Sequence, residues 1–340
     1  MKRSIYHIAK EANVSVATVS RVLNNKPDVS EATRQKILEL IHNGRFEPRV
    51  VKNKADTLGV IYHWIAHSFG NYYVFDILSG IVDAAASFGF NVLLIPDMPR
   101  DIRDLGTYLK QRHVQGVIHI APMSDDVWLS RIGVARIPQI VVGGRCDRYN
   151  ISYVDSDNVD GAREAVRYLL NFGHRRIGFI GGQMQQSNHV DRLTGYRAAL
   201  HDAGIQCDER LIFLIDDESA WVSGEGGKQG ALYLLSQPTP PTAIFVASGH
   251  CIMGALSAIN DLGLKVPDDV SIVGYDDIPL ASYTVPPLTT VRQPIYELGK
   301  KGAEELLCLI DDTSGNRDVE PKRIVLHAPL IIRQSVKPIS

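Results

Sequence analysis

The chain has 340 residues, of which 45% are hydrophobic and 22% are charged. This composition argues against a disordered or fibrous chain, and the length predicts two or three folding units. No apolar run approaches the roughly 18 residues that a membrane helix needs. The start, Met1-Lys2-Arg3-Ser4-Ile5, leads into polar residues instead of the apolar core of a signal peptide. We therefore expect a cytoplasmic protein without a membrane partner.

Metal and cofactor sites are not expected from the sequence. The four cysteines lie at least 44 residues apart, which excludes Cys-x-x-Cys knuckles and argues against a disulfide framework. His63 and His67 are four residues apart but lack the glutamate of a zinc-binding His-Glu-x-x-His motif. A P-loop would need glycine at position 222 and Ser or Thr at 229, where Val222 and Gln229 stand. No Gly-x-Ser-x-Gly elbow occurs either, so we expect no enzyme.

Charge is distributed unevenly along the chain. Residues 1–58 carry 11 Lys and Arg against 6 Asp and Glu, whereas the whole chain has a formal net charge of −2. A small basic unit is therefore joined to a larger acidic one. This asymmetry favours a head that binds a polyanion on a body that does not.

The basic unit contains the pattern of three short helices. Apolar residues recur at helical spacing in two stretches, Ile5, Ile8, Ala9, Ala12 and then Val16, Val19, Val22, Leu23. Between them, Asn13 stands where a tight turn needs a left-handed residue, and Ser15 is placed to cap the second helix. A third helix is predicted from its cap Ser30 to a stop at Gly44. The pattern predicts an all-α helix-turn-helix head.

The segment from Ile8 to Asn24 resembles the head of the lactose repressor family of bacterial transcription regulators. It departs from that family at Asn13, where glycine is usual. The resemblance implies that the second helix enters the major groove of operator DNA, with Val16, Ala17 and Arg21 reading base edges. It casts a second set as phosphate-contacting or capping residues: Ser15, Thr18, Ser20 and Asn24.

Residues 45–58 link the head to the body. In the family, this link inserts a leucine into the minor groove of DNA. Here the link is short and has no leucine between Pro48 and Leu58, so a regulator with weakened specific DNA binding stays open as an alternative. Arg49 and Lys52 suit phosphate contacts, or they belong to an ordinary solvated linker.

The body alternates short apolar runs with helical patterns. Four buried strands are predicted near 59–62, 91–95, 116–120 and 139–142, and four more near 176–180, 211–215, 243–247 and 271–275. Two such series predict two lobes with parallel sheets. Ligands of these sheets bind at the carboxyl ends of the strands, so the cleft between the lobes is the expected site.

The body also resembles the lactose repressor family, through Phe172 to Gly182, Val273 to Asp277 and Pro286 to Gln293. The resemblance implies an α/β periplasmic-binding-protein-like body of two doubly wound parallel-sheet lobes. The expected divisions are a head at 1–46, a hinge linker at 47–56 and a body at 57–340. Three crossings between lobes would place 57–156 and 294–318 in the first lobe, and 157–293 and 319–340 in the second.

The resemblance also implies residues that bind a small effector. Arg192 and Asp276 match a charged pair that fixes polar groups of the ligand, although a salt bridge between lobes is the alternative. Tyr73 matches an aromatic that stacks on a ring, Ser248 follows a strand, and Gln293 lies at a crossing strand that lines the cleft. Trp221 is a weaker candidate, because a core aromatic would look the same. The family usually has Asp where Gly249 stands, and Gly143-Gly144 end a strand where a polar side chain is common.

Taken together, these patterns predict a cytoplasmic, nucleoid-associated homodimer that represses transcription from double-stranded operator DNA. Its DNA affinity would respond to a monosaccharide or oligosaccharide in the cleft. The rival interpretation is a transport-type solute-binding protein, which would have the same two-lobed body but no basic head.

Overall fold

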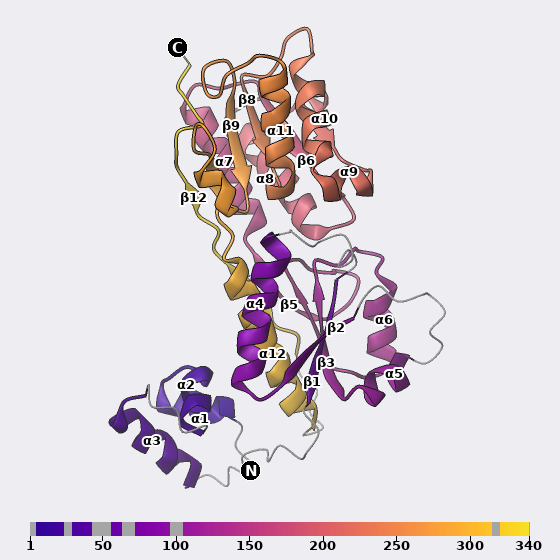
Figure 1. The fold of residues 1–340 in the computed structure, drawn as a ribbon, viewed down its shortest axis with the longest axis vertical. Coiled ribbons are helices and arrows are strands. Elements are labelled where there is room, and N and C mark those ends of the chain that lie inside the picture. Colours follow the sequence, from indigo (N-terminus) through magenta and orange to yellow (C-terminus); the bar gives the residue numbers. More distant parts are fainter. Residues whose placement is uncertain are drawn as a thin grey trace.

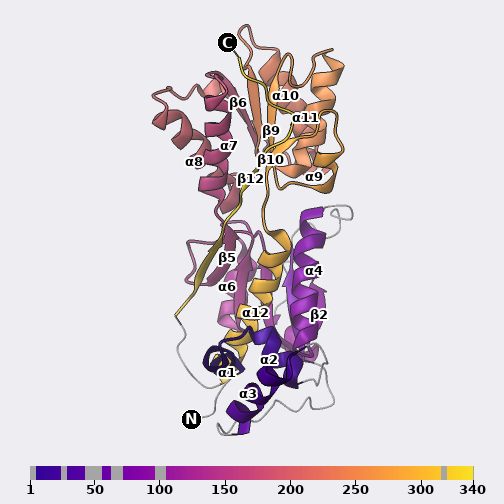
Figure 2. The same ribbon diagram turned by 90° about the vertical axis from the view of Figure 1, so that its left-hand side faces the viewer.

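The computed structural model describes residues 5–23, 29–42, 56–62, 72–95, 105–314 and 320–339. A small helical head lies at the free end of the first of two α/β lobes, and the C-terminus lies at the far end of the second lobe (Figures 1 and 2). Within the described residues, no helix is both long enough and apolar enough to span a bilayer.

The head consists of α1 (Ile5–Ala12), α2 (Val16–Leu23) and α3 (Glu31–His42). Asn13 has a φ of 58°, which confirms the expected left-handed turn. The Ser15 and Ser30 hydroxyls accept hydrogen bonds from the Thr18 and Thr33 N–H groups, at 3.1 and 3.3 Å, so both predicted caps are confirmed. A small apolar core holds the three helices together: Ile8, Ala9, Ala12, Val19, Val22 and Ile37. The end predicted at Gly44 lies outside the described residues.

The first lobe is built on a sheet of six parallel strands in the order β11-β5-β4-β3-β1-β2. The strands are β1 (Thr57–Ile61), β2 (Asn91–Ile95), β3 (Val114–Ile120), β4 (Gln139–Val142), β5 (Ser152–Ser156) and β11 (Arg323–Leu326). The helices are α4 (Tyr72–Ser87), α5 (Leu105–Gln111), α6 (Val127–Val134) and α12 (Ile295–Ser314).

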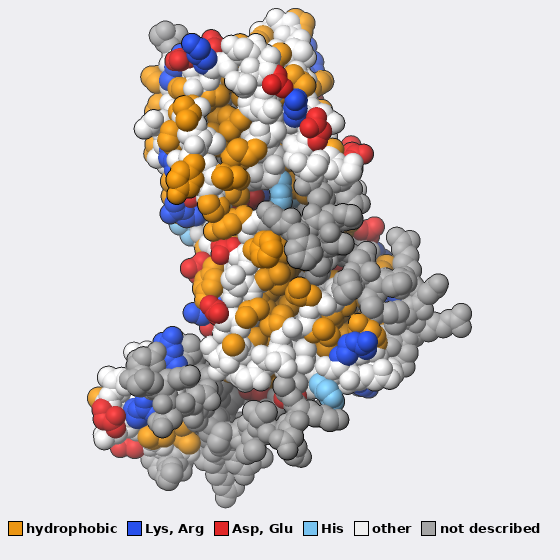
Figure 3. Space-filling model, viewed as in Figure 1, with side chains coloured by type: hydrophobic (Ala, Val, Ile, Leu, Met, Phe, Trp, Pro, Cys, Tyr) orange, Lys and Arg blue, Asp and Glu red, His pale blue; other side chains and the backbone are white. Residues whose placement is uncertain are grey.

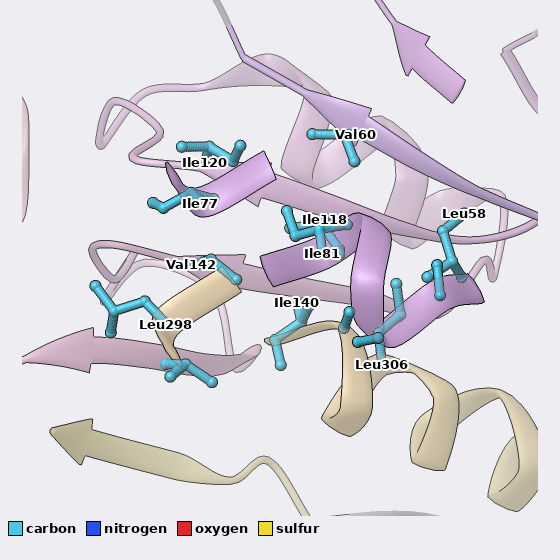
Figure 4. Close-up of a cluster of buried hydrophobic side chains, with 14 of the residues drawn as sticks. Leu58, Val60, Ile77, Ile81, Ile118, Ile120, Ile140, Val142, Leu298 and Leu306 are labelled. Atoms are coloured by element: carbon cyan, nitrogen blue, oxygen red, sulfur yellow. The ribbon is translucent and has the colours of Figure 1, made fainter. Parts of the chain in front are cut away.

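Helices cover both faces of this first sheet. On one face, α4 and α12 pack against alternate strand residues, so that Ile77, Leu298 and Leu306 meet Val60 and Ile118 (Figure 4). On the other face, α5 and α6 cover a second cluster that includes Leu109, Trp128 and Val117. Burial on both faces explains why the strands are nearly continuous apolar runs.

The second lobe repeats the plan with the strand order β12-β10-β9-β8-β6-β7. Its strands are β6 (Ile177–Gly181), β7 (Ile212–Leu214), β8 (Ala243–Val246), β9 (Ser271–Tyr275), β10 (Thr289–Val291) and β12 (Leu330–Ile331). Its helices are α7 (Asn158–Asn171), α8 (Ser187–Asp202), α9 (Glu218–Ser223), α10 (Glu225–Leu235) and α11 (Gly249–Asp261), with 3-10 turns at Glu209–Leu211 and Pro279–Ser282. Neighbouring strands are parallel except β10 and β12. The expected pair of doubly wound lobes is therefore confirmed, with one antiparallel edge strand.

The chain passes between the lobes after β5, after β10 and after β11. The expectation that residues 319–340 all belong to the second lobe is wrong for β11. This strand pairs in register with β5, Arg323 opposite Tyr153, because β5 offers an open edge to the first sheet. The last crossing therefore lies at 327–329.

Candidate functional site

Helix α2, which the sequence predicts to read DNA, has a buried face and an open face. Val19 and Val22 are buried in the head core, whereas Ser15 and Arg21 are exposed and Thr18 is half-buried. The Ser15 hydroxyl lies 2.8 Å from the Thr18 hydroxyl, so these two residues cap the helix. The side chains of Val16, Ala17 and Ser20, together with Asn24, Arg49 and Lys52, lie outside the described parts of the chain, as do His63 and His67.

Arg192 and Asp276 lie together at the side of the second lobe that faces the first. Arg192, on α8, lies 3.6 Å from the Asp276 carboxylate and donates to Asn158 Oδ1 at 2.9 Å and to the Ala247 carbonyl at 2.8 Å. Its guanidinium also stacks 3.9 Å from the centre of the Tyr275 ring. Both members of the pair belong to the second lobe, so the alternative of a salt bridge between lobes is wrong.

Asp276 is held by donors from several elements. Gln293 donates to its Oδ1 at 2.5 Å, and the Gly249 N–H donates to its Oδ2 at 2.8 Å. Asp276 and Asp277 have φ angles of 76° and 48°, which is strained for residues with a side chain. The departure at Gly249 has a steric reason, since a Cβ there would lie 3.0 Å from the Asp276 carboxylate. Ser248, buried just before α11, adjoins this contact.

Tyr73 enters the same region from α4 of the first lobe. Burial raises the pKa of its hydroxyl well above the ordinary value, and the charges of Asp155 and Arg192 act on it. Its hydroxyl occupies the space where a Cβ on Gly143 would lie, at 2.1 Å, and Gly143 has a φ of 75°. Glycine at 143 is therefore required by both the backbone and Tyr73.

Trp221 belongs to the buried apolar cluster of the second lobe. Its ring meets that of His189 edge to face, with centroids 4.6 Å apart, and lies 6.2 Å from that of His250. Burial and the charge of Arg192 lower the pKa of both imidazoles, so they are neutral at pH 7. Trp221 therefore packs beside both imidazole rings.

Two polar residues of this region escaped the sequence analysis. Asp155 is the next-to-last residue of β5 and is 3% exposed, and Asn158 starts α7 directly after the first crossing. Asn158 donates to Asp155 Oδ1 at 3.1 Å while its own Oδ1 accepts from Arg192 and Tyr275. A signal existed in the polar run Asp155-Ser156-Asp157-Asn158 after an apolar stretch, but β5 itself was not predicted.

Several buried polar atoms near the facing ends of the two sheets have no hydrogen-bond partner among the described residues. They are Ser156 Oγ, Gln183 Oε1 and His189 Nδ1. Buried polar groups in proteins are nearly always satisfied by protein, water or ligand. Ser156 ends β5, Gln183 follows β6, and His189 lies one helical turn before Arg192 on α8, so these atoms are available to a polar ligand near the ends of the sheets.

A cavity of about 370 Å³ opens beside the crossing segments. Of the predicted residues, Asp276 and Gln293 line it, together with Asp76 from α4, Glu297 from α12 and His327. Tyr73, Arg192, Trp221 and Ser248 do not line this cavity. The cavity therefore reaches the predicted site from the side of the crossings.

Hydrogen bonds and an ion pair join the two lobes at a set of residues that we call the interlobe latch. On the second lobe it comprises residues 185–191, and on the first lobe Ala121, Ser124, Gly143 and Arg145. Gln186 donates to the Ala121 carbonyl at 2.7 Å, and Arg145 binds the Asp191 carboxylate through two nitrogens. The Asn188 amide donates to the Gly143 carbonyl at 3.2 Å. A change in the angle between the lobes must break or remake these bonds.

Two family models match parts of this chain. The model described as "Bacterial regulatory proteins, lacI family" matches residues 4–49, and a periplasmic binding protein-like domain matches residues 166–336. The probable HTH-type transcriptional repressor ExuR of Bacillus subtilis is 32% identical, covering 98% of each chain. The HTH-type transcriptional regulator DegA of the same organism is 33% identical, covering 100% of each chain.

Solved structures extend these matches to three dimensions. The transcriptional regulator CelR in complex with cellobiose covers 98% of this chain and all of its own, with a TM-score of 0.75 and 32% identity. The lac repressor dimer bound to operator and an anti-inducer covers 99% of this chain and all of its own, with a TM-score of 0.71 and 26% identity. These relatives regulate transcription and are not enzymes. The chain belongs to the lacI family of bacterial regulatory proteins and is a DNA-binding transcription regulator.

Proposed function

We propose that this regulator is a cytoplasmic, nucleoid-associated repressor whose operator affinity responds to a sugar bound between its lobes. The observation that carries the proposal is the buried polar cluster around Arg192 and Asp276, with its unsatisfied neighbours Ser156, Gln183 and His189. A carboxylate accepts from two hydroxyls and a guanidinium donates in a fixed plane, which is the chemistry that orients a sugar. Tyr73, Ser248, Gln293 and Trp221 complete the proposed effector site.

DNA recognition is assigned to the open face of α2. Arg21 is exposed there and suits bidentate binding to a guanine edge, while Val16 and Ala17 suit thymine methyl groups. Ser15, Thr18, Ser20 and Asn24 would set the register on phosphates, helped by Arg49 and Lys52. The head at 1–46, the hinge at 47–56 and the body from 57 onward remain the proposed divisions.

A homodimer would present two recognition helices to a near-palindromic site. Exposed apolar side chains support such an interface on both lobes: Tyr72, Phe75 and Val82 on α4, and Leu280, Tyr283, Val285 and Ile332 on the second lobe. Hydrophobic side chains gather on the same face of both lobes (Figure 3). Patches of this kind on a soluble protein mark association surfaces.

Two measurements on the full chain test the proposal. Selection from a pool of random duplexes should enrich a near-palindromic sequence, and a pool with no enriched sequence would favour the alternative of weakened specific binding. A thermal-shift screen against monosaccharides, oligosaccharides, nucleobases and sugar phosphates should then raise the Tm, because a ligand at 100 times its Kd adds about 2.7 kcal/mol of stability. An active sugar must also change the affinity for the selected duplex, and by linkage the duplex must change the affinity for the sugar equally.

A further inference from the structure

Asp155 is a buried carboxylate, and the described residues donate hydrogen bonds to only one of its two oxygens. Its Oδ1 accepts hydrogen bonds from the Ser156 N–H at 2.8 Å and from the Asn158 amide at 3.1 Å. None of the described residues donates a hydrogen bond to its Oδ2. A side chain that is 3% exposed therefore keeps one strong acceptor for a group outside the described chain.

The neighbours of Asp155 connect it to Arg192, a residue of the proposed effector site. Asn158 bridges Asp155 to Arg192, since its amide donates to the carboxylate and its oxygen accepts from the guanidinium. The charge of Asp155 acts on Tyr73 from α4 and on Tyr275 at the end of β9. Asp155 of the first lobe therefore contacts Asn158 of the second lobe, and its charge acts on tyrosines of both lobes.

Negative charge is in excess at this place. Among the described residues, three carboxylates, Asp155, Asp191 and Asp276, face two guanidiniums, Arg145 and Arg192. Arg145 already binds Asp191, and Arg192 already pairs with Asp276. Asp155 is left without a cation of its own, and burial raises the pKa of its carboxyl to about 7.

The other unsatisfied atoms near Asp155 belong to uncharged groups, so they cannot neutralise the charge of an anionic ligand. His189 is buried, and burial together with Arg192 holds its pKa well below the ordinary value, so its ring carries no charge. Ser156 Oγ is a neutral hydroxyl, and Gln183 Oε1 is an acceptor. The site offers neutral hydrogen-bonding groups and one unmatched carboxyl.

Resting on the effector function proposed above, we propose that Asp155 is a specificity-determining residue. Its Oδ2 accepts a hydrogen bond from a hydroxyl of the effector, and its charge selects uncharged polyhydroxylated ligands against sugar acids and sugar phosphates. An anionic ligand would meet this carboxylate with both guanidiniums already engaged, and buried like charges repel strongly.

Stability separates this role from a structural one. Asp155→Asn keeps an acceptor for Ser156 and Asn158 but removes a desolvated charge, so the Tm without ligand should stay equal or rise at pH 7.5. Since the folded pKa of Asp155 is raised from about 3.8 to about 7, the wild type loses stability as pH rises through that window, and the Tm difference should widen from pH 4 to pH 7. The other titratable groups facing Asp155 are common to both proteins: Tyr73, Arg145, Asp191, Arg192, Tyr275 and Asp276. A lower Tm for Asp155→Asn throughout would assign Asp155 to structure and overturn the proposal.

Binding to matched neutral and acidic probes is the decisive experiment. The full chain is titrated calorimetrically at pH 8, above the pKa of about 7 for Asp155, with D-glucose, D-galactose, D-ribose and cellobiose, and with D-glucuronate, D-galacturonate, ribose 5-phosphate and cellobionate. We expect the neutral member of a binding pair to bind at least tenfold more tightly than its acid. Acids that bind as tightly as their neutral partners overturn the selectivity of Asp155 and leave the sugar function standing. If no probe binds, both the sugar function and this inference fail.

The variant then identifies the residue responsible. Asp155→Asn should weaken the neutral probe at least tenfold and reduce the preference over its acid to less than threefold. The control Asp160→Asn removes the same charge from an exposed position on α7 and should bind as the wild type does. Unchanged binding and preference in Asp155→Asn would overturn the assignment.

Discussion

The head and the cleft between the lobes are both polar sites, but they are assembled in opposite ways. In the head, α1, the turn at Asn13 and α2 follow one another within 19 residues, and the backbone hydrogen bonds that shape the turn, from Asn13 to Lys10 and from Val14 to Ala9, are local. In the cleft, Tyr73, Asp155, Arg192 and Asp276 come from four separate elements of two lobes. A local site can be identified from a short segment, whereas an assembled site depends on the packing of the whole body.

The two regions also differ in how their polar groups are satisfied. In the described residues of the head, polar groups are satisfied by helix caps and by Lys36, which donates to the Ala12 carbonyl at 2.9 Å. The cleft leaves Ser156, Gln183 and His189 with unsatisfied atoms. The difference teaches that the described head satisfies its polar groups internally, whereas the cleft keeps polar groups available for the effector that we propose to bind there.

The largest effect is expected from Asp276→Ala, which tests the proposed effector site in the cleft. It leaves Arg192 buried without its counter-charge, so the free energy of unfolding of the body should fall by about 3–5 kcal/mol and the effector response should vanish. Chemical denaturation measures the first effect and calorimetry the second. Asp268→Ala removes an exposed partner of Lys337 and should change little. Effector binding that survives Asp276→Ala would contradict the assignment.

The head is tested by Arg21→Ala. Loss of a bidentate contact to guanine should cost about 1–3 kcal/mol on the selected operator while random DNA binds almost as before. Fluorescence anisotropy on both duplexes measures the difference, with Arg34→Ala on α3 as the control. An equal loss on both duplexes would show that Arg21 contacts phosphate only.

Gly143→Ala tests whether long-range packing fixes a residue of the cleft. The Cβ of the new alanine would clash with the Tyr73 hydroxyl, and the alanine backbone would have to adopt a positive φ. The body should therefore lose about 1–3 kcal/mol of stability. Adding Tyr73→Phe should restore part of that loss, because the clashing oxygen is gone. Strictly additive losses in this double-mutant cycle would mean that the two residues do not interact.

Asn13→Ala tests the local turn of the head. Alanine lacks the tolerance of asparagine for the left-handed region, so the head should lose about 1 kcal/mol, whereas Asn13→Gly should be nearly neutral. Thermal unfolding followed by circular dichroism resolves the effect. A glycine variant as unstable as the alanine variant would point to a role for the Asn13 side chain itself.

Arg145→Met should have a small effect on stability, about 1 kcal/mol, because the Arg145 side chain is 28% exposed, although that of its partner Asp191 is only 13% exposed. It should nevertheless make the lobes open more readily, which small-angle scattering would detect as a larger radius of gyration. Asp191→Asn should open the lobes in the same way. An unchanged radius in both variants would remove the latch from any role in interlobe motion.

Prediction from the sequence succeeded where a signal is local and repeated. The caps at Ser15 and Ser30, the left-handed turn at Asn13 and the two series of apolar strands follow from spacing alone, and the structure confirms them. A crossing strand was expected only near Gln293, where β10 lies, and β5, β11 and β12 were not predicted, because strands as short as the two-residue β12 show no periodicity of their own. Missing β5 also hid Asp155 and Asn158.

The sequence by itself determined the basic head, its helix order and the two-lobed parallel architecture, since helical and strand periods are properties of neighbouring residues. Only the tertiary structure decided that β11 joins the first sheet, that Arg192 pairs with Asp276 within one lobe, and that the charge of Asp155 acts on tyrosines of both lobes. These contacts link residues up to about 170 positions apart, such as Tyr153 and Arg323, and depend on which strand edge is open when the sheets form. Such a choice is made by the packed body, because no local pattern encodes the distance between two remote side chains.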